Sequence, residues 1–123
     1  MSGTKLLLDT NILLYLLNGD ETLADLLSGT RPYISFITEL ELLSFQKLKS
    51  SEKKKISNLI KHCTIIDVNA PIKELTINIR QKSNLKLPDA LIAATSKYLQ
   101  IPLLSADKDF DKVKDLDLIY YEV

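Results

Sequence analysis

Four acidic residues, far apart in this chain of 123 residues, stand beside apolar runs or helix-start signals. They are Asp9, Glu41, Asp89 and Asp107. Carboxylate oxygens are the ligands that Mg²⁺ and Mn²⁺ prefer, whereas zinc sites usually include His or Cys. The chain has one His and one Cys, which leaves almost nothing for a His- or Cys-based site. If the four acids meet, they form a site for a divalent cation bound by oxygen.

The elements that position these acids follow from the alternation of short apolar runs with amphipathic segments. We expect strands at residues 5–9, 33–36, 64–68, 102–105 and 118–121. Helices are expected at residues 12–17, 23–27, from 38 onward, 52–61, 71–82 and 88–99, with one helical turn at 109–113. This order predicts a three-layer α/β/α sandwich with a central, mostly parallel sheet. No linker or repeat interrupts it, so residues 1–123 are expected to form a single domain.

The predicted topology brings the four acids to one edge of the sheet. In an open parallel sheet, ligands bind outside the carboxyl ends of the strands, where the helices also begin. Asp9 follows the first predicted strand and Asp107 follows the fourth. Glu41 and Asp89 lie in the first turns of predicted helices. The site is therefore expected where these strands end and these helices begin.

Two acids compete for the second position of the site. Thr38 is expected to cap its helix, with Glu41 completing a capping box and with Leu40 and Leu43 in the buried stripe. Glu39 and Glu41 are two positions apart, so they point about 200° apart around a helix. Only one of them can face the site, and we expect Glu39 to face solvent.

A cluster of four carboxylates needs compensating positive charge. Two carboxylates about 4 Å apart repel by about 4 kcal/mol at an effective dielectric constant of 20. Divalent ions relieve this repulsion, generate a nucleophile from water near neutral pH and neutralise charge on a phosphate. A site of this kind suits the hydrolysis of phosphodiester bonds.

Four sequence blocks surround these acids, at residues 7–11, 34–42, 87–94 and 103–110. In this order they resemble the PIN domain family, and in particular the VapC-type toxins of bacterial and archaeal toxin–antitoxin pairs. The resemblance covers essentially the whole chain. It implies a Mg²⁺- or Mn²⁺-dependent endoribonuclease whose catalytic and metal-binding acids are Asp9, Glu41, Asp89 and Asp107.

The resemblance also implies supporting residues and partners. Thr10, Asn11, Ser105 and Asp109 match positions that assist the acids, with Ser105 standing where Thr is commoner. One departure is Phe45, where relatives commonly have Gly. The implied substrate is structured RNA, often tRNA or ribosomal RNA. The implied protein partners are a cognate antitoxin that obstructs the acidic site and a second copy of the chain.

Composition limits the other possible partners. The net charge is zero, with 16 basic and 16 acidic side chains, so overall charge gives no argument for nucleic-acid binding. One lysine-rich stretch, with Glu52 as its only acid, is either a solvated helix surface or a phosphate-facing patch: Lys47, Lys49, Lys53, Lys54, Lys55 and Lys61. No apolar run approaches the roughly 20 residues that span a bilayer. We therefore expect a cytoplasmic protein without membrane contact.

Other interpretations of the acids stay open from the sequence. Each acid, taken alone, fits an ordinary polar turn, helix start or acidic loop. An Asp-dependent phosphotransfer domain also places an Asp after an early strand, but the phosphatase pattern needs a second Asp where Asn11 stands. A non-catalytic PIN-like module that binds RNA or protein is the remaining alternative. Such a module would be expected to have lost acids that this chain retains.

Overall fold

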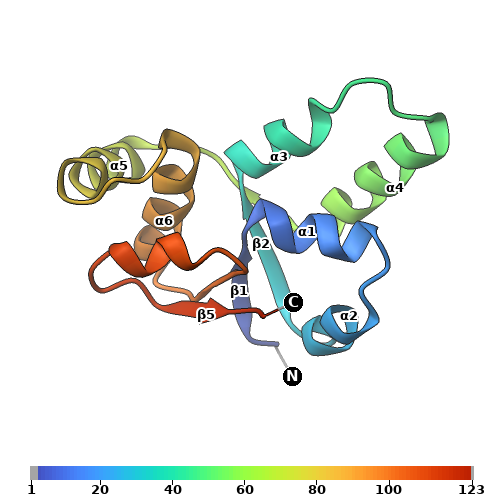
Figure 1. Ribbon diagram of the computed structural model, residues 1–123, viewed down its shortest axis with the longest axis horizontal. Helices are drawn as coiled ribbons and strands as arrows, with labels where there is room; N and C mark the ends of the chain where they lie inside the picture. Colours follow the sequence, from blue (N-terminus) through green and yellow to red (C-terminus); the bar gives the residue numbers. More distant parts are fainter. Residues whose placement is uncertain (1–2, 123) are drawn as a thin grey trace.

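Five strands form one sheet in the computed structural model, which describes residues 3–122 (Figure 1). Residues 1, 2 and 123 of the predicted domain lie outside the described residues. The strands are β1 (Lys5–Leu8), β2 (Arg31–Ser35), β3 (Thr64–Ile66), β4 (Leu103–Ser105) and β5 (Leu118–Tyr120). Their order across the sheet is β3-β2-β1-β4-β5, and each neighbouring pair is parallel. The predicted α/β fold with a mostly parallel sheet is thus confirmed.

Helices cover both faces of this sheet. They are α1 (Thr10–Leu17), α2 (Glu21–Leu27), α3 (Phe36–Leu43), α4 (Ser50–Lys61), α5 (Ala70–Lys82), α6 (Leu87–Leu99) and the 3-10 helix η1 (Lys108–Lys112). Figure 1 shows α5 and α6 on one side of β1 and β2, and α1, α2 and α4 on the other. The helices α1 and α2 each end two residues before a glycine in the left-handed region, Gly19 at φ 87° and Gly29 at φ 80°. Within residues 3–122, no helix combines the length and apolar content that crossing a membrane requires.

The side chains of the central strands alternate between two hydrophobic clusters, one on each face of the sheet. On β1, Leu7 belongs to the cluster beneath α5 and α6, whereas Leu6 and Leu8 belong to the cluster beneath α1 and α4. On β4, Leu103 and Leu104 divide in the same way. Strands buried on both faces are apolar at successive positions, as the sequence of β1 is. The strand ends that carry the acids are therefore anchored from both sides.

The start of α3 differs from the prediction. Ser35, rather than Thr38, caps this helix, and its hydroxyl oxygen accepts a hydrogen bond from the Ile37 N–H at 3.2 Å. Ser35 ends β2 with extended backbone angles (φ −72°, ψ 151°), which are those of an N-cap residue. The predicted capping box between Thr38 and Glu41 is therefore wrong. Glu41 lies in the second turn of α3, not the first.

The buried face of α3 also differs from the prediction. Thr38 and Leu42 are its buried residues, whereas Leu40 and Leu43 are 51% and 56% exposed. Five of the eight residues of α3 are apolar, so their spacing does not single out one inward face. Phe45, just beyond the helix, is also exposed. The end of α3 thus presents apolar side chains to the surroundings.

Candidate active site

Asp9 lies where β1 ends and α1 begins. Its Oδ1 accepts a hydrogen bond from the Thr10 N–H at 2.8 Å, which caps α1. Its Oδ2 accepts one from the Ser105 hydroxyl, at the end of β4, at 2.6 Å. Both carboxylate oxygens are therefore held, one by each neighbouring element. The predicted polar turn at residues 9–11 is the N-cap and first turn of α1.

The surroundings of Asp9 oppose its negative charge. Burial raises the pKa of Asp9 from its ordinary value of 3.8 to about 6, although the hydrogen bonds from Ser105 and Thr10 lower it. The nearby carboxylates of Asp89 and Asp107 raise it further. Among residues 3–122, no lysine, arginine or histidine forms an ion pair with Asp9. The ionised form of Asp9 is therefore one that a bound cation would stabilise.

Glu41 is held by a residue of α1. The Thr10 hydroxyl donates a hydrogen bond to Glu41 Oε1 at 2.7 Å and lies 3.0 Å from the Thr38 hydroxyl. These contacts join the start of α1 to the inward face of α3. They hold the Glu41 carboxylate against the first residue of α1, and the negative charge of Glu41 contributes to the raised pKa of Asp89.

Asp107 lies in the loop between β4 and η1, and the same serine that holds Asp9 fixes this loop. Ser105 Oγ accepts a hydrogen bond from the Asp107 N–H at 3.0 Å. Asp107 Oδ1 accepts one from the Asp109 N–H at 2.9 Å and caps η1. The Asn11 side-chain oxygen accepts one from the main-chain N–H that precedes Asp107, at 3.4 Å. The loop is thus tied to the start of α1.

Asp89 lies in the first turn of α6, as predicted. Burial raises its pKa above the ordinary value, and a neighbouring lysine, Lys86, partly offsets this effect. The pKa is raised further by the negative charges of three other acids, which are Asp107, Glu41 and Asp109. Asp89 is therefore within electrostatic reach of acids from α3 and from the loop after β4. The structure brings together acids from four separate segments at the carboxyl edge of the sheet.

These acids do not form a closed metal cage. Within residues 3–122, no group of three or more His, Cys, Asp or Glu side chains is arranged to hold an ion by itself. Mg²⁺ usually keeps several of its waters and is bound through one or two carboxylates together with substrate phosphates. An open, oxygen-only set of donors with excess negative charge fits such an ion. Zinc sites, by contrast, usually include His or Cys ligands.

One residue of the site, Thr38, was predicted only as a helix cap. Its side chain is fully buried and lies beside the Thr10 hydroxyl. A signal for it exists in the sequence, because a polar residue within the apolar stretch around Phe36 and Leu42 needs a buried hydrogen-bond partner. The partner itself, 28 residues away, is visible only in the fold.

We expect Thr10→Val to weaken Mn²⁺ binding about 10- to 100-fold, the usual effect of removing a residue that orients a metal ligand. Valine keeps the volume of threonine but cannot donate to Glu41. Titration calorimetry with Mn²⁺ measures the change. Thr30→Val is the matched control, because the Thr30 hydroxyl donates to a carbonyl at the end of α2. Equal Mn²⁺ affinity for the two variants would exclude this role for Thr10.

Comparison with known proteins assigns the chain to a class. Residues 6–116 match the PIN domain family. A chain of a toxin–antitoxin complex from Klebsiella pneumoniae is 30% identical and superimposes with a TM-score of 0.82, covering 95% of this chain and 98% of that one. VapBC2 from Rickettsia felis, bound to a DNA fragment from its promoter, gives a TM-score of 0.87 over 97% of this chain and 100% of that one. At 22% identity, this second likeness shows the fold alone.

The chain therefore belongs to the PIN domain family, whose match spans most of its length. Ribonuclease VapC6 of Methanocaldococcus jannaschii is 39% identical over 70 residues, which is 54% of this chain and 46% of that protein. The matched segment thus spans about half the length of this relative. The resemblance inferred from the sequence blocks is thus confirmed, since the family model is that of the PIN domain and this partly matching relative is a VapC ribonuclease.

Proposed function

We propose that this protein is a metal-dependent endoribonuclease and the toxin of a type II toxin–antitoxin pair. The observation that carries the proposal is the convergence of four acids at the carboxyl edge of a PIN-type sheet, with the pKa of Asp9 raised to about 6. The 39% identity to a VapC ribonuclease supports RNA as the substrate class. The retained acids argue against a non-catalytic module, and Asn11 argues against an Asp-dependent phosphatase.

The residues that would hold Mg²⁺ or Mn²⁺ are Asp9, Glu41, Asp89 and Asp107. When bound, such an ion supplies charge neutralisation at the scissile phosphate and a nucleophile from water near neutral pH. The chain itself supplies orientation, because Thr10 holds Glu41 and Ser105 holds Asp9. Asn11 and Asp109 hold the loop that carries Asp107.

The test is cleavage of labelled tRNA and ribosomal RNA by the purified chain with Mg²⁺, with Mn²⁺ and with a chelator. We expect internal cuts with at least one ion and none with the chelator. RNA binding without cleavage in both ions would instead favour a non-catalytic binding module. A phosphorylated Asp9 after incubation with acetyl phosphate would favour a phosphotransfer domain.

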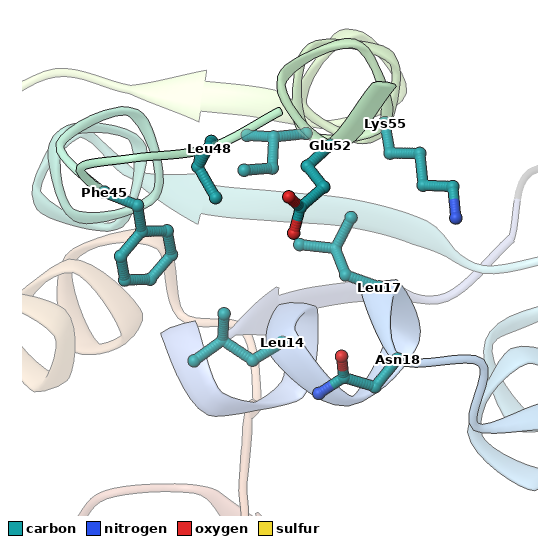
Figure 2. Close-up of a pocket in the computed structure, with 8 residues that line it drawn as sticks. Leu14, Leu17, Asn18, Phe45, Leu48, Glu52 and Lys55 are labelled. Carbon is teal, nitrogen blue, oxygen red and sulfur yellow. The ribbon is translucent and has the colours of Figure 1, made fainter. Parts of the chain in front are cut away.

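An apolar hollow of about 280 Å³ lies between α1 and the segment from the end of α3 into α4, and we call it the α1–α4 groove. It is lined by Leu14, Leu17, Asn18, Phe45, Leu48, Glu52, Lys55 and Ile56. Figure 2 shows Leu14 and Leu17 of α1 on one side of this space, with Phe45 and Leu48 across from them. A second hollow of about 300 Å³ shares Phe45 and Leu48. Open apolar grooves of this kind accept the apolar face of an amphipathic helix.

We assign the α1–α4 groove to a helix of the cognate antitoxin. The similar protein from Klebsiella pneumoniae was solved as a toxin–antitoxin complex, which supports a partner of this kind. The groove runs along the side of α1, and the first turn of α1 lies at the acid site. A segment that leaves the groove toward the start of α1 therefore reaches the acids and obstructs them.

Phe45→Asp is expected to weaken antitoxin binding by about 30-fold or more, because a central aromatic contact is typically worth about 2 kcal/mol or more. The antitoxin for this test is to be sought as the product of a small gene directly upstream of the one for this chain. RNA cleavage by the variant alone should stay unchanged, since Phe45 lies outside the acid site. Tyr98→Asp on α6 is the control, because Tyr98 is similarly exposed but outside the groove. Unchanged antitoxin affinity in Phe45→Asp would place the partner elsewhere.

A homodimer, which the resemblance implies, remains part of the proposal. Ile77 on α5 and Leu87 on α6 are exposed and line one hollow at the turn between these helices. This apolar surface is separate from the α1–α4 groove. Sedimentation of the chain with and without antitoxin measures its oligomeric state directly.

A further inference from the structure

A basic hollow of about 280 Å³ lies between α5, α6 and the end of η1, and we call it the basic pocket. Four lysines from three separated segments line it, which are Lys82, Lys97, Lys112 and Lys114. Asp115 is the only acid in its lining. In Figure 1, α5, α6 and the orange-red segment that contains η1 gather on the side of the sheet away from α4. The pocket is thus distinct from the α1–α4 groove.

The lysines of the basic pocket outnumber the acids in and beside it. Within residues 3–122, the only ion pair closer than 4 Å joins Lys112 to Asp109, at 3.6 Å. The Lys97 ammonium donates a hydrogen bond to the Lys114 carbonyl at 3.1 Å, which ties the loop after η1 to α6. Asp117 lies in an adjoining hollow that shares Lys97 and Asp115 with this one. Four cations around a concave volume outweigh these acids and attract anions.

The basic pocket is connected to the acid site through η1. Lys112 pairs with Asp109, and the Asp109 N–H donates to the Asp107 carboxylate. A five-residue 3-10 helix is about 10 Å long, at roughly 2 Å per residue. Asp107 and the pocket residue Lys112 therefore lie at opposite ends of this short element. A polyanion with one phosphate at the acids has its neighbouring phosphates close to the lysines.

We propose that the basic pocket binds a backbone phosphate of the RNA substrate, one that lies next to the cleaved bond and is not itself cleaved. The inference rests on the proposed function, because the polyanion concerned is the RNA that the acid site would cut. The lysine-rich helix α4 offers a weaker alternative. Its consecutive Lys53, Lys54 and Lys55 are about 100° apart around the helix and do not converge on one volume.

The test measures binding of a fluorescent single-stranded RNA to the metal-free protein in chelator, over a range of salt concentrations. For the double variant Lys82→Gln/Lys114→Gln we expect RNA affinity to fall by about tenfold at low salt. The slope of log affinity against log salt should decrease by roughly 0.7 for each phosphate that the variant no longer neutralises. The control Lys54→Gln/Lys61→Gln removes the same charge from exposed positions on α4, and we expect it to retain the wild-type slope.

A slope and an affinity equal to those of the α4 control would overturn the inference.

Kinetics give a second readout, because a dinucleotide is too short to reach from the acids to the pocket. The double variant should raise KM for a long RNA without lowering kcat, and should cleave the dinucleotide like wild type. If wild-type protein cleaves RNA and the two double variants behave alike, the pocket assignment is wrong and the assignment as a nuclease is kept. If wild type binds RNA through the pocket and cleaves none, the nuclease assignment fails instead.

Discussion

Asp89→Asn is expected to lower kcat/KM for RNA cleavage by at least about 10³-fold, with the fold intact. Asp89 stands in the first turn of α6, and its charge is opposed by burial and by neighbouring acids. Asparagine keeps its shape and removes the charge that would help hold a divalent ion. Loss of about 4 kcal/mol of transition-state stabilisation corresponds to this factor, at 1.36 kcal/mol per tenfold. Initial rates with a labelled RNA and saturating Mn²⁺ measure the effect.

One control separates the role of Asp89 from a general effect of charge, and a pair of variants on α3 tests Glu41. Asp111→Asn removes one negative charge from an exposed position on η1 and is expected to keep full activity. On α3, Glu41→Gln is expected to lower cleavage strongly, whereas Glu39→Gln should leave it within about twofold of wild type. Wild-type rates for Asp89→Asn would refute the assignment of that residue. Equal rates for the two α3 variants would remove Glu41 from the site.

The location of the acid site could be predicted because parallel topology determines it. Once β1 and β4 are recognised as buried apolar runs, Asp9 and Asp107 must follow their carboxyl ends. Proline near the start of α6 likewise places Asp89 in a first helical turn at the same edge. These inferences need only local signals and the rule that crossovers are right-handed.

The contacts within the site could not be predicted in the same way. The hydrogen bond from Thr10 to Glu41 joins residues 31 positions apart, and it depends on how α1 and α3 are rotated against each other. The start of α3 also differs from the prediction, because Ser35 caps the helix three residues before the predicted cap. Ser and Thr are both common N-cap residues, and the capping-box spacing of Thr38 and Glu41 favoured the wrong one.

The exposed leucines of α3 were placed wrongly for a different reason. A helix face that another molecule covers is apolar, just as a face buried in the chain's own core is. Leu43 has the pattern of a core residue, although the fold leaves it exposed, where it lines the second hollow that shares Phe45 and Leu48 with the α1–α4 groove. An apolar pattern on a helix therefore does not by itself show which face the chain's own core buries.

The metal-free protein is expected to lose stability through Asp9 as the pH rises from about 4 to above 6. The pKa of Asp9 is about 6 in the folded chain and ordinary, near 3.8, in the unfolded chain. Between these values the folded state keeps a proton that the unfolded state has released. Stability therefore falls as the pH increases through this range. The stability that the proton on Asp9 contributes is fully present only below the pKa that Asp9 has in the unfolded chain. The pKa difference corresponds to about 3 kcal/mol at 1.36 kcal/mol per unit.

Asp9→Asn isolates this contribution from that of every other titrating group. Its asparagine carries no charge, so in chelator the variant should match wild type near pH 4 and exceed it by up to about 3 kcal/mol near pH 8. Urea unfolding at several pH values measures the difference. Adding Mn²⁺ near pH 8 should stabilise wild type, because the ion binds only the folded chain, and should stabilise the variant much less. A variant that is less stable than wild type near pH 8 in chelator would mean that the Asp9 charge is already balanced, and the acids would then have no need of a cation.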